Sequence, residues 1–180
     1  MIVWLASYPK SGNTFVRSLL SSYIFSKDGN FNFELLKEIK QFPDNSLFKQ
    51  LGVDIENEDE MFKNYINSQK LFNEKDSITF LKTHSCFVNT NKFQFTDRHN
   101  TLGVIYIVRD PRNIVTSFSH HFQLKPEQAL ESLLSHQYLG QTSKDHCTTY
   151  IASWKYHFNS WKVFRRFNKY LLVRYEDLIN

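Results

Sequence analysis

The sequence predicts an α/β fold in which helices flank a central parallel sheet. Three short apolar runs, Ile2 to Ala6, Ile78 to Lys82 and Leu102 to Val108, have the length of buried strands. Helical patterns separate them, and strands that alternate with helices form parallel sheets with crossover helices. At 180 residues, the chain has the size of one domain with a core of its own. We therefore expect a single domain over residues 1–180.

A helix is predicted after the first and after the third of these strands. From Asn13 to about Phe25 the apolar residues recur at helical spacing. The polar stretch from Ser26 to Asp76 is expected to hold helices and loops. Asp110 supplies a cap acceptor, and Pro111 suits the first helical position because its missing N–H costs nothing there. The helix that they begin is predicted to run to about Phe122.

The C-terminal half is predicted to hold two more helices and a last strand. Pro126 to Tyr138 has the pattern of a short helix, and Tyr170 to Arg174 that of a strand. Residues 147–166 predict an amphipathic helix, because their apolar residues form one stripe. The stripe consists of Tyr150, Ile151, Trp154, Phe158, Trp161 and Phe164.

The composition is that of a soluble globular protein with an aromatic core. Hydrophobic residues make up 41%, charged residues 22% and aromatic residues 16%, including 17 Phe. Cys86 and Cys147 lack metal-ligand spacing, so we expect neither a disulfide framework nor a metal site. No apolar run approaches the ~18 residues that a membrane span needs. These features predict a cytoplasmic protein that has no membrane partner and binds no metal.

The charge balance favours an anionic ligand. The formal net charge is +4 and the isoelectric point is near 9.0, which suits an anion without saying which kind. The basic residues are scattered, with neither a polybasic run nor an aromatic ladder of the kind found in RNA-binding proteins. A small anion is therefore favoured over nucleic acid.

The joint between the first strand and the first helix has the chemistry of a phosphate loop. A strand, a tight loop and a helix present free backbone N–H groups and the positive helix end to an anion. Gly12 permits close approach of the backbone and Lys10 adds a full charge. The kinase-type loop Gly-x-x-x-x-Gly-Lys-Ser/Thr is absent, because here the lysine precedes the glycine. The alternative is an ordinary Pro-Gly turn with a solvated lysine.

This loop, Tyr8-Pro9-Lys10-Ser11-Gly12-Asn13-Thr14-Phe15, closely resembles the 5′-phosphosulfate loop of sulfotransferases that use 3′-phosphoadenosine-5′-phosphosulfate (PAPS). The resemblance implies a P-loop-like α/β sandwich. It also implies that Lys10 contacts the oxygen bridging phosphate and sulfate and that residues Ser11, Gly12, Asn13 and Thr14 hold the 5′-phosphate. Phe15 stands where many members have a tryptophan that stacks on adenine, and phenylalanine can stack as well.

A second motif follows the strand Leu102 to Val108. Arg109 lies at the carboxyl end of that strand, which is the edge where open α/β sheets bind ligands. Ser117 lies two turns along the next helix, so a phosphate beside the helix could contact both residues. The alternative is an Arg109 paired with Asp110. The segment resembles the 3′-phosphate motif of the same family, and Tyr175 matches a tyrosine that contacts the nucleotide in that family.

His84 is the candidate general base. Sulfuryl transfer needs a group that takes the acceptor's proton and cations that hold the developing charge, and histidine has an ordinary pKa of ~6.5. His84 follows a strand end, whereas His120 and His121 are expected on a helix surface or in packing. Lys82-Thr83-His84 resembles the Lys-Thr-His sequence of the cytosolic-type branch, whose histidine is the base. By that resemblance Lys82 assists with the sulfate charge.

The resemblance implies a compact, bacterial-like sulfotransferase that uses PAPS, releases adenosine 3′,5′-bisphosphate and acts on a hydroxyl or amine of a small acceptor. Family members continue with a loop and an Arg-Lys-Gly segment that cover the nucleotide, so we expect this domain to be C-terminally incomplete relative to them. Two alternatives stay open, a P-loop-type nucleotide phosphotransferase and a catalytically reduced nucleotide-binding module. The acceptor and a homo-oligomeric state are open as well.

Overall fold

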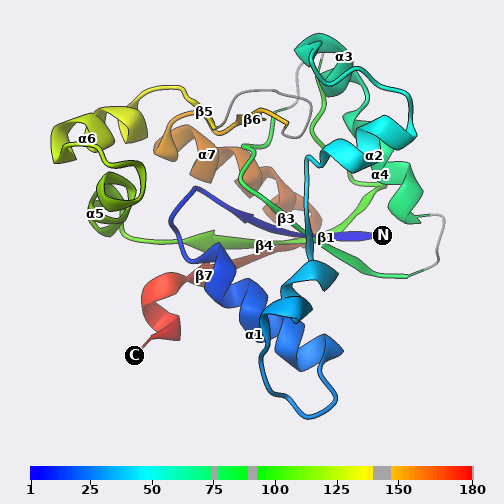
Figure 1. Ribbon diagram of the computed structural model, residues 1–180, viewed down its shortest axis with the longest axis horizontal. Helices are drawn as coiled ribbons and strands as arrows, with labels where there is room; N and C mark the ends of the chain where they lie inside the picture. Colours follow the sequence, from blue (N-terminus) through cyan, green and yellow to red (C-terminus); the bar gives the residue numbers. More distant parts are fainter. Residues whose placement is uncertain (74–76, 89–92, 140–146, 180) are drawn as a thin grey trace.

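A five-stranded parallel sheet forms the centre of the molecule, in the strand order β2-β3-β1-β4-β7. The computed structural model describes residues 1–73, 77–88, 93–139 and 147–179 (Figure 1). The predicted fold class is confirmed. The strands are β1 (Ile2–Ser7), β2 (Lys40–Gln41), β3 (Thr79–Thr83), β4 (Thr101–Val108) and β7 (Tyr170–Arg174).

The order of the strands reverses at β1. Ala6 near the end of β1 pairs with Thr83 of β3 on one side and with Tyr106 of β4 on the other. The chain adds β2 beyond β3 and β7 beyond β4. A crevice forms at such a switch point, outside the carboxyl ends of the strands.

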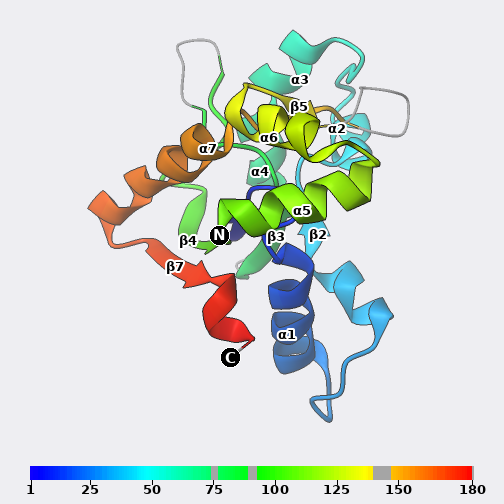
Figure 2. The same ribbon diagram turned by 90° about the vertical axis from the view of Figure 1, so that its left-hand side faces the viewer.

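Helices cover both faces of this sheet. In Figures 1 and 2, α1 and η1 lie on one face, and α7 lies on the other. The helices are α1 (Asn13–Phe25), α2 (Asn45–Gln50), α3 (Glu58–Lys63), α4 (Tyr65–Asn73), α5 (Pro111–Phe122), α6 (Pro126–Leu134) and α7 (Trp154–Trp161), with 3₁₀ helices η1 (Phe33–Glu38), η2 (Lys162–Phe167) and η3 (Tyr175–Leu178).

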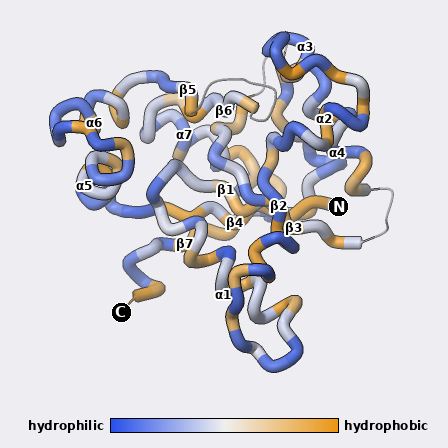
Figure 3. The backbone as a smooth tube through the Cα atoms, in the orientation of Figure 1, coloured by the Kyte–Doolittle hydropathy of each residue, from blue (hydrophilic) through white to orange (hydrophobic). Residues whose placement is uncertain are grey.

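The core between the sheet and α7 is built on aromatic rings, as the composition predicts. Trp4 of β1 is fully buried, and its ring centroid lies 5.5 Å from that of Phe42, 5.2 Å from that of Phe95 and 6.3 Å from that of Trp161. Such tilted and edge-to-face pairs add to the burial of apolar area. Figure 3 shows hydrophobic stretches running through the strands of the sheet.

The predicted helix over residues 147–166 is wrong in its first part. Thr149–Tyr150 form β6, which pairs antiparallel with β5 (Tyr138–Leu139). Ala152 has a left-handed φ of 54°, which a continuous right-handed helix excludes. Ser153 then caps α7 by accepting a hydrogen bond from the backbone N–H of Tyr156.

The neighbouring predictions need smaller corrections. The helix predicted over Pro126 to Tyr138 ends at Leu134, because Tyr138 already belongs to β5. The polar stretch from Ser26 to Asp76 holds the edge strand β2 besides helices and loops, and its residues 74–76 lie outside the described residues. None of the described helices has both the length and the apolar character that a membrane span needs.

Candidate functional site

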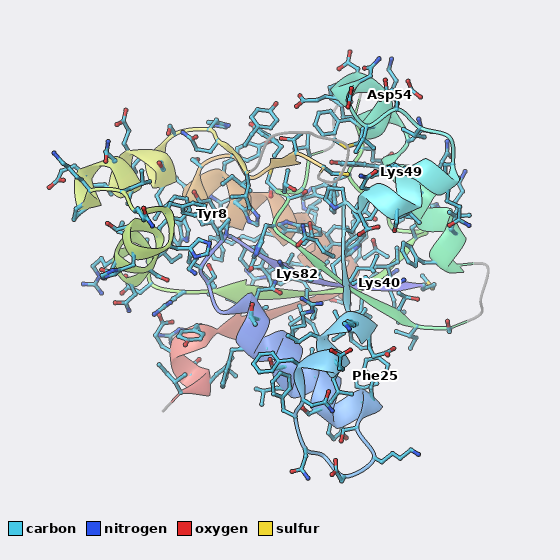
Figure 4. All side chains as sticks on the ribbon, viewed as in Figure 1. Tyr8, Phe25, Lys40, Lys49, Asp54 and Lys82 are labelled. Atoms are coloured by element: carbon cyan, nitrogen blue, oxygen red, sulfur yellow. The ribbon has the colours of Figure 1, made fainter. Side chains whose placement is uncertain are left out.

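All five strands of the sheet contribute to one site at their carboxyl ends. The loop with Lys10 follows β1, Gln41 ends β2, and Arg109 follows β4. Lys82, labelled in Figure 4, lies in β3 and is followed two residues later by His84. Tyr175 follows β7. The parallel sheet thus brings together residues from distant parts of the sequence.

A cavity of about 530 Å³ opens between these strand ends, α1 and α5; we call it the catalytic cavity. Three cationic residues line it, Lys10, Lys82 and Arg109, and no Asp or Glu among the described residues does so. An unbalanced positive lining attracts and concentrates an anion. Of the predicted site residues, those in the lining are Lys10, Gly12, Asn13, Thr14, Lys82, His84, Arg109 and Ser117.

The loop after β1 has the backbone of an anion cradle. Lys10 and Gly12 have left-handed φ angles of 66° and 95°, and a non-glycine residue in that region points to a constrained functional turn. No side chain caps α1 at Gly12, and its first turn carries no acidic residue. The first N–H groups of the helix therefore lack intrahelical partners and can bind an anion.

Two side chains of this loop are buried beneath it. The hydroxyl of Ser11 has no hydrogen-bond partner within the described residues, and Ser11 itself is only 1% exposed. Asn13 uses its amide nitrogen to donate to the carbonyl of Leu5 at 3.0 Å and to Oγ of Ser7 at 3.1 Å. Asn13 thus stabilises the end of β1. Its side-chain amide nitrogen already donates both of these hydrogen bonds within the protein.

Arg109 is held in the cavity by contacts that leave its charge unneutralised. Its Nη1 donates to the carbonyl of Lys10 at 3.2 Å, and its Nε is buried without a partner in the described parts of the chain. Asp110 does not neutralise it, because Asp110 pairs with Arg112 and caps α5. Ser117 lies on α5 and lines the same cavity.

Tyr175 joins the β1 loop to Arg109. The centre of the Arg109 guanidinium lies 4.6 Å from the centroid of the Tyr175 ring, within reach of a cation–π interaction. The same ring covers Gly12 so closely that a Cβ there would overlap it. Phe15 meets Tyr175 edge-on at 6.2 Å and is 39% exposed. The two rings lie together beside the cradle rather than in the lining of the catalytic cavity.

The geometry fixes the tautomer of His84. Its Nδ1 lies 2.8 Å from the backbone carbonyl of Ser7, and a carbonyl only accepts, so Nδ1 carries the proton. Nε2 then keeps its lone pair, and no described group hydrogen-bonds to it. Burial, followed by the charge of Lys82, lowers the pKa of His84 to about 3. The ring is therefore neutral at physiological pH, with an acceptor nitrogen in a cavity wall.

Lys82 and Gln41 form the other wall. Nζ of Lys82 donates to Oε1 of Gln41 at 3.0 Å. Burial, with a smaller effect of the nearby Arg17, lowers the pKa of Lys82 to about 8. Gln41 gave no signal in the sequence, because it belongs to a two-residue strand that exists only through its pairing with β3.

Helix α7 holds the backbone of the segment that carries His84. Nε2 of His157 donates to the carbonyl of His84 at 3.0 Å, and Nε1 of Trp161 donates to the carbonyl of Ser85 at 3.0 Å. The hydroxyl of Tyr106 donates to Nδ1 of His157 at 2.7 Å. Burial lowers the pKa of His157 to about 4, so the ring stays neutral.

Two residues in and around the site are predicted by no sequence motif. His157 belongs to no recognised motif. Its position on the same helix face as Trp161 is a signal that both side chains contact the same segment of the chain. His121 was expected on a helix surface or in packing, and it lines the catalytic cavity together with Phe122.

Comparison with known proteins relates this arrangement to one family. A family model described as the sulfotransferase domain matches residues 2–180. Mouse sulfotransferase SULT7A1, solved in complex with PAP, superposes with a TM-score of 0.57 at 19% identity, over 98% of this chain and 52% of that chain. Retinol dehydratase, solved with retinol and PAP, gives a TM-score of 0.56 at 17% identity, over 99% of this chain and 55% of that chain.

The chain thus spans about half the length of these two solved structures. At sequence identities of 19% and 17%, the similarity to these two structures shows the fold alone. No curated protein sequence gives a significant match.

Proposed function

The chain belongs to the sulfotransferase family, and from that premise we propose that it transfers a sulfuryl group from PAPS to a hydroxyl or amine of a small acceptor, with His84 as the general base. One observation carries the proposal. A neutral imidazole whose Nε2 keeps its lone pair lines the same cavity as Lys10, Lys82 and Arg109. Proton removal and stabilisation of negative charge can therefore take place side by side.

The residues present suit the donor. When bound, PAPS supplies the sulfuryl group, and its desulfated product is PAP, adenosine 3′,5′-bisphosphate. The uncapped start of α1 and the unpartnered hydroxyl of Ser11 offer donors to the 5′-phosphate. Arg109 and Ser117 offer a separate site to the 3′-phosphate, and the buried Nε of Arg109 is a donor that still lacks an acceptor. Phe15 and Tyr175 offer ring faces beside the cradle.

His84 would accept the acceptor's proton at Nε2. The imidazolium that forms keeps its Nδ1–H hydrogen bond to the carbonyl of Ser7, which favours the charged form. His84 gains basicity when an anion in the cavity offsets the charges of Lys10 and Lys82. Both lysines are then placed to stabilise the negative charge that develops during transfer.

The acceptor would enter beside apolar side chains. Phe122 of α5 and Leu139 of β5 line the catalytic cavity together with His84. One neighbour of similar fold was solved with retinol, which supports a small organic acceptor here. Pockets of this kind combine apolar walls with a few polar groups that orient the ligand.

Titration calorimetry with a panel of nucleotides tests the proposal. We expect adenosine 3′,5′-bisphosphate to bind more tightly than ADP or ATP, without a requirement for Mg²⁺. Arg109→Ala should weaken that binding by about 10- to 150-fold, since a hydrogen bond to a charged group contributes ~1.5–3 kcal/mol. Arg112→Ala is the matched control, because Arg112 is exposed, pairs with Asp110 and does not line the catalytic cavity.

Tighter and Mg²⁺-dependent binding of ATP would contradict the proposal and favour a phosphotransferase. Binding of the bisphosphate with no sulfuryl transfer to any phenol, alcohol or amine would favour a nucleotide-binding module without turnover.

A further inference from the structure

Helix α6 lies beside α5 at one end of the molecule (Figure 1), and a groove runs along it. The groove has a volume of about 450 Å³, and α5, α6 and the start of α7 form its wall; we call it the α6 groove. Among the described residues, none lines both this groove and the catalytic cavity. Apolar side chains form most of the wall, among them Val115, Leu130, Leu133, Leu134 and Trp154.

The two sides of α6 differ in how well they are covered. Ala129 and Leu133 pack in a buried cluster with Ile114 of α5 and are 0% and 3% exposed. Leu130 and Leu134, by contrast, are 48% and 73% exposed. A contiguous apolar surface rimmed by polar residues is typical of an interaction site, whereas single exposed leucines are not. The open leucines beside an apolar groove therefore point to a partner.

The rim of the α6 groove is positively charged. Arg112 of α5 has a side chain that is 88% exposed, and it pairs with Asp110. Lys155 of α7 is exposed and forms no ion pair within the described residues. No Asp or Glu in the described part of the chain lines the groove. A partner that suits this surface combines apolar side chains with acidic ones.

The exposed face of α6 itself has this combination. Glu127, Leu130, Glu131 and Leu134 have the spacing i, i+3, i+4 and i+7, which places them on one face of the helix. Both glutamates are exposed, and neither forms an ion pair with any residue that the structure describes. One helix of this chain thus carries the apolar and acidic side chains that the α6 groove would bind.

We propose that the α6 groove binds α6 of a second copy of this chain in a two-fold symmetric dimer. Each copy carries both the groove and the helix, so the same contact occurs twice. The two exposed leucines of one copy would pack on Trp154 of the other, whose ring stacks on Phe158 at 5.8 Å. The two glutamates would lie near Arg112 and Lys155, and these opposite charges would set the register of the helix in the groove.

The proposed interface does not compete with the catalytic cavity. Val115 of α5 lines the α6 groove, whereas Ser117 of the same helix lines the catalytic cavity. Dimerisation therefore leaves the residues of the catalytic cavity free, and the proposal does not depend on the group that is transferred.

Two charge-reversal variants test the contact. Glu127→Lys/Glu131→Lys changes the helix, and Arg112→Glu/Lys155→Glu changes the rim of the groove. Sedimentation velocity and light scattering on the wild-type protein should show a dimer that dissociates on dilution. Each variant alone should weaken dimerisation by at least about 10-fold, because like charges then face each other. An equimolar mixture of the two variants should form a heterodimer with nearly wild-type affinity, since opposite charges meet again at both contacts.

Leu134→Asp tests the apolar part of the contact. It should weaken dimerisation by at least about 10-fold, because a charge would be buried against an apolar wall. Leu19→Asp is the matched control, since Leu19 of α1 is 51% exposed and lies outside the α6 groove. Glu38→Lys/Glu56→Lys is the control for charge, at two exposed glutamates away from the groove. Both controls should dimerise like the wild-type protein.

Folding is checked within the same experiments. A restored heterodimer shows that both charge-reversal variants are folded, and circular dichroism checks the two leucine variants. Wild-type protein that stays monomeric at every concentration would overturn the proposal, as would a mixture of folded charge-reversal variants that does not dimerise. Loss of the dimer in Leu19→Asp but not in Leu134→Asp would assign the interface to α1 instead. A mass that keeps rising with concentration would contradict the closed two-fold arrangement.

Discussion

At the scale of single residues, the chemistry of His84 follows from the position of one proton. The carbonyl of Ser7 holds that proton on Nδ1, and the burial of the ring keeps the second nitrogen deprotonated. A neighbouring lysine shares this environment. Burial lowers the pKa of Lys82 to about 8, so this cation titrates within a range that kinetics can reach.

The first prediction concerns the pH dependence of kcat/KM, which reports the ionisation of the free enzyme. His84 becomes protonated only as the pH falls to its pKa of about 3 or below, so the profile should have no acid limb near pH ~6.5, the ordinary value for histidine. Above the Lys82 pKa of about 8, the cation is lost and kcat/KM should fall.

Lys82→Met should remove the basic limb and lower the plateau. An acid limb near pH ~6.5 that disappears in His84→Asn would show that His84 ionises as an ordinary histidine, against this account.

The second prediction concerns Gly12, whose Cα lies under the Tyr175 ring. Gly12→Ala should reduce affinity for adenosine 3′,5′-bisphosphate by at least about 10-fold, because the new methyl group displaces Tyr175 from Arg109 and strains the cradle. Gly29→Ala is the control. Gly29 has a similar positive φ of 77°, with no atom within 4 Å of the added Cβ.

Calorimetry and thermal unfolding on both variants separate the two effects. Gly29→Ala should show only the backbone cost, ~1–2 kcal/mol of unfolding free energy, with unchanged nucleotide affinity. Equal affinities in the two variants would mean that the contact between Tyr175 and Gly12 has no part in binding.

At the scale of elements, α7 determines where His84, the proposed base, lies. His157 and Trp161 bond to consecutive carbonyls of the His84 segment, and Ser160 accepts the N–H of Phe87 at 3.0 Å. Three bonds from one helix face thus fix a segment that has no regular structure of its own. We regard His157 as a positioning residue, since it reaches the reaction only through His84.

The third prediction follows from this contact. His157→Phe should lower kcat by about 10-fold or more, because the His84 segment loses its anchor and small misplacements of catalytic groups are costly. Product-nucleotide affinity should stay unchanged. In a His84→Asn background, His157→Phe should cause little further loss, because residues that act as a unit are not additive.

A purely structural role would give a different pattern. The loss of kcat in His157→Phe would then persist in the His84→Asn background and would follow the loss of thermal stability. His99→Phe, at an exposed histidine that does not line the catalytic cavity, is the control for the substitution itself.

Local signals explain which elements the sequence predicts. β1 with α1, and β4 with α5, form strand–loop–helix joints whose apolar runs are continuous in sequence, and Asp110 caps α5. Their predicted bounds agree closely with the structure. The strands β2, β5 and β6 have two residues each and exist through pairing with distant segments. Gln41, Leu139 and Thr149 reach the catalytic cavity from such strands, so no local pattern could place them there.

At the scale of the whole molecule, the parallel sheet makes the site. Residues as far apart in sequence as Gly12 and Tyr175 meet because the carboxyl ends of all the strands lie at the same edge of the sheet. This explains why the site could be predicted in outline from motifs that follow strands. The hydrogen bonds from α7 to the His84 segment depend on packing across the sheet, so no sequence motif predicts them.

The measurement that bears most directly on the central claim is sulfuryl transfer from radiolabelled PAPS to a screened acceptor, with wild-type protein and His84→Asn compared. Asparagine keeps some hydrogen bonding but cannot accept the proton at neutral pH, so turnover should fall by about 10²–10⁴-fold. Affinity for adenosine 3′,5′-bisphosphate should stay within a few-fold, because His84 lies on the acceptor side. Near wild-type turnover by folded His84→Asn with a productive acceptor would contradict the assignment of His84 as the base.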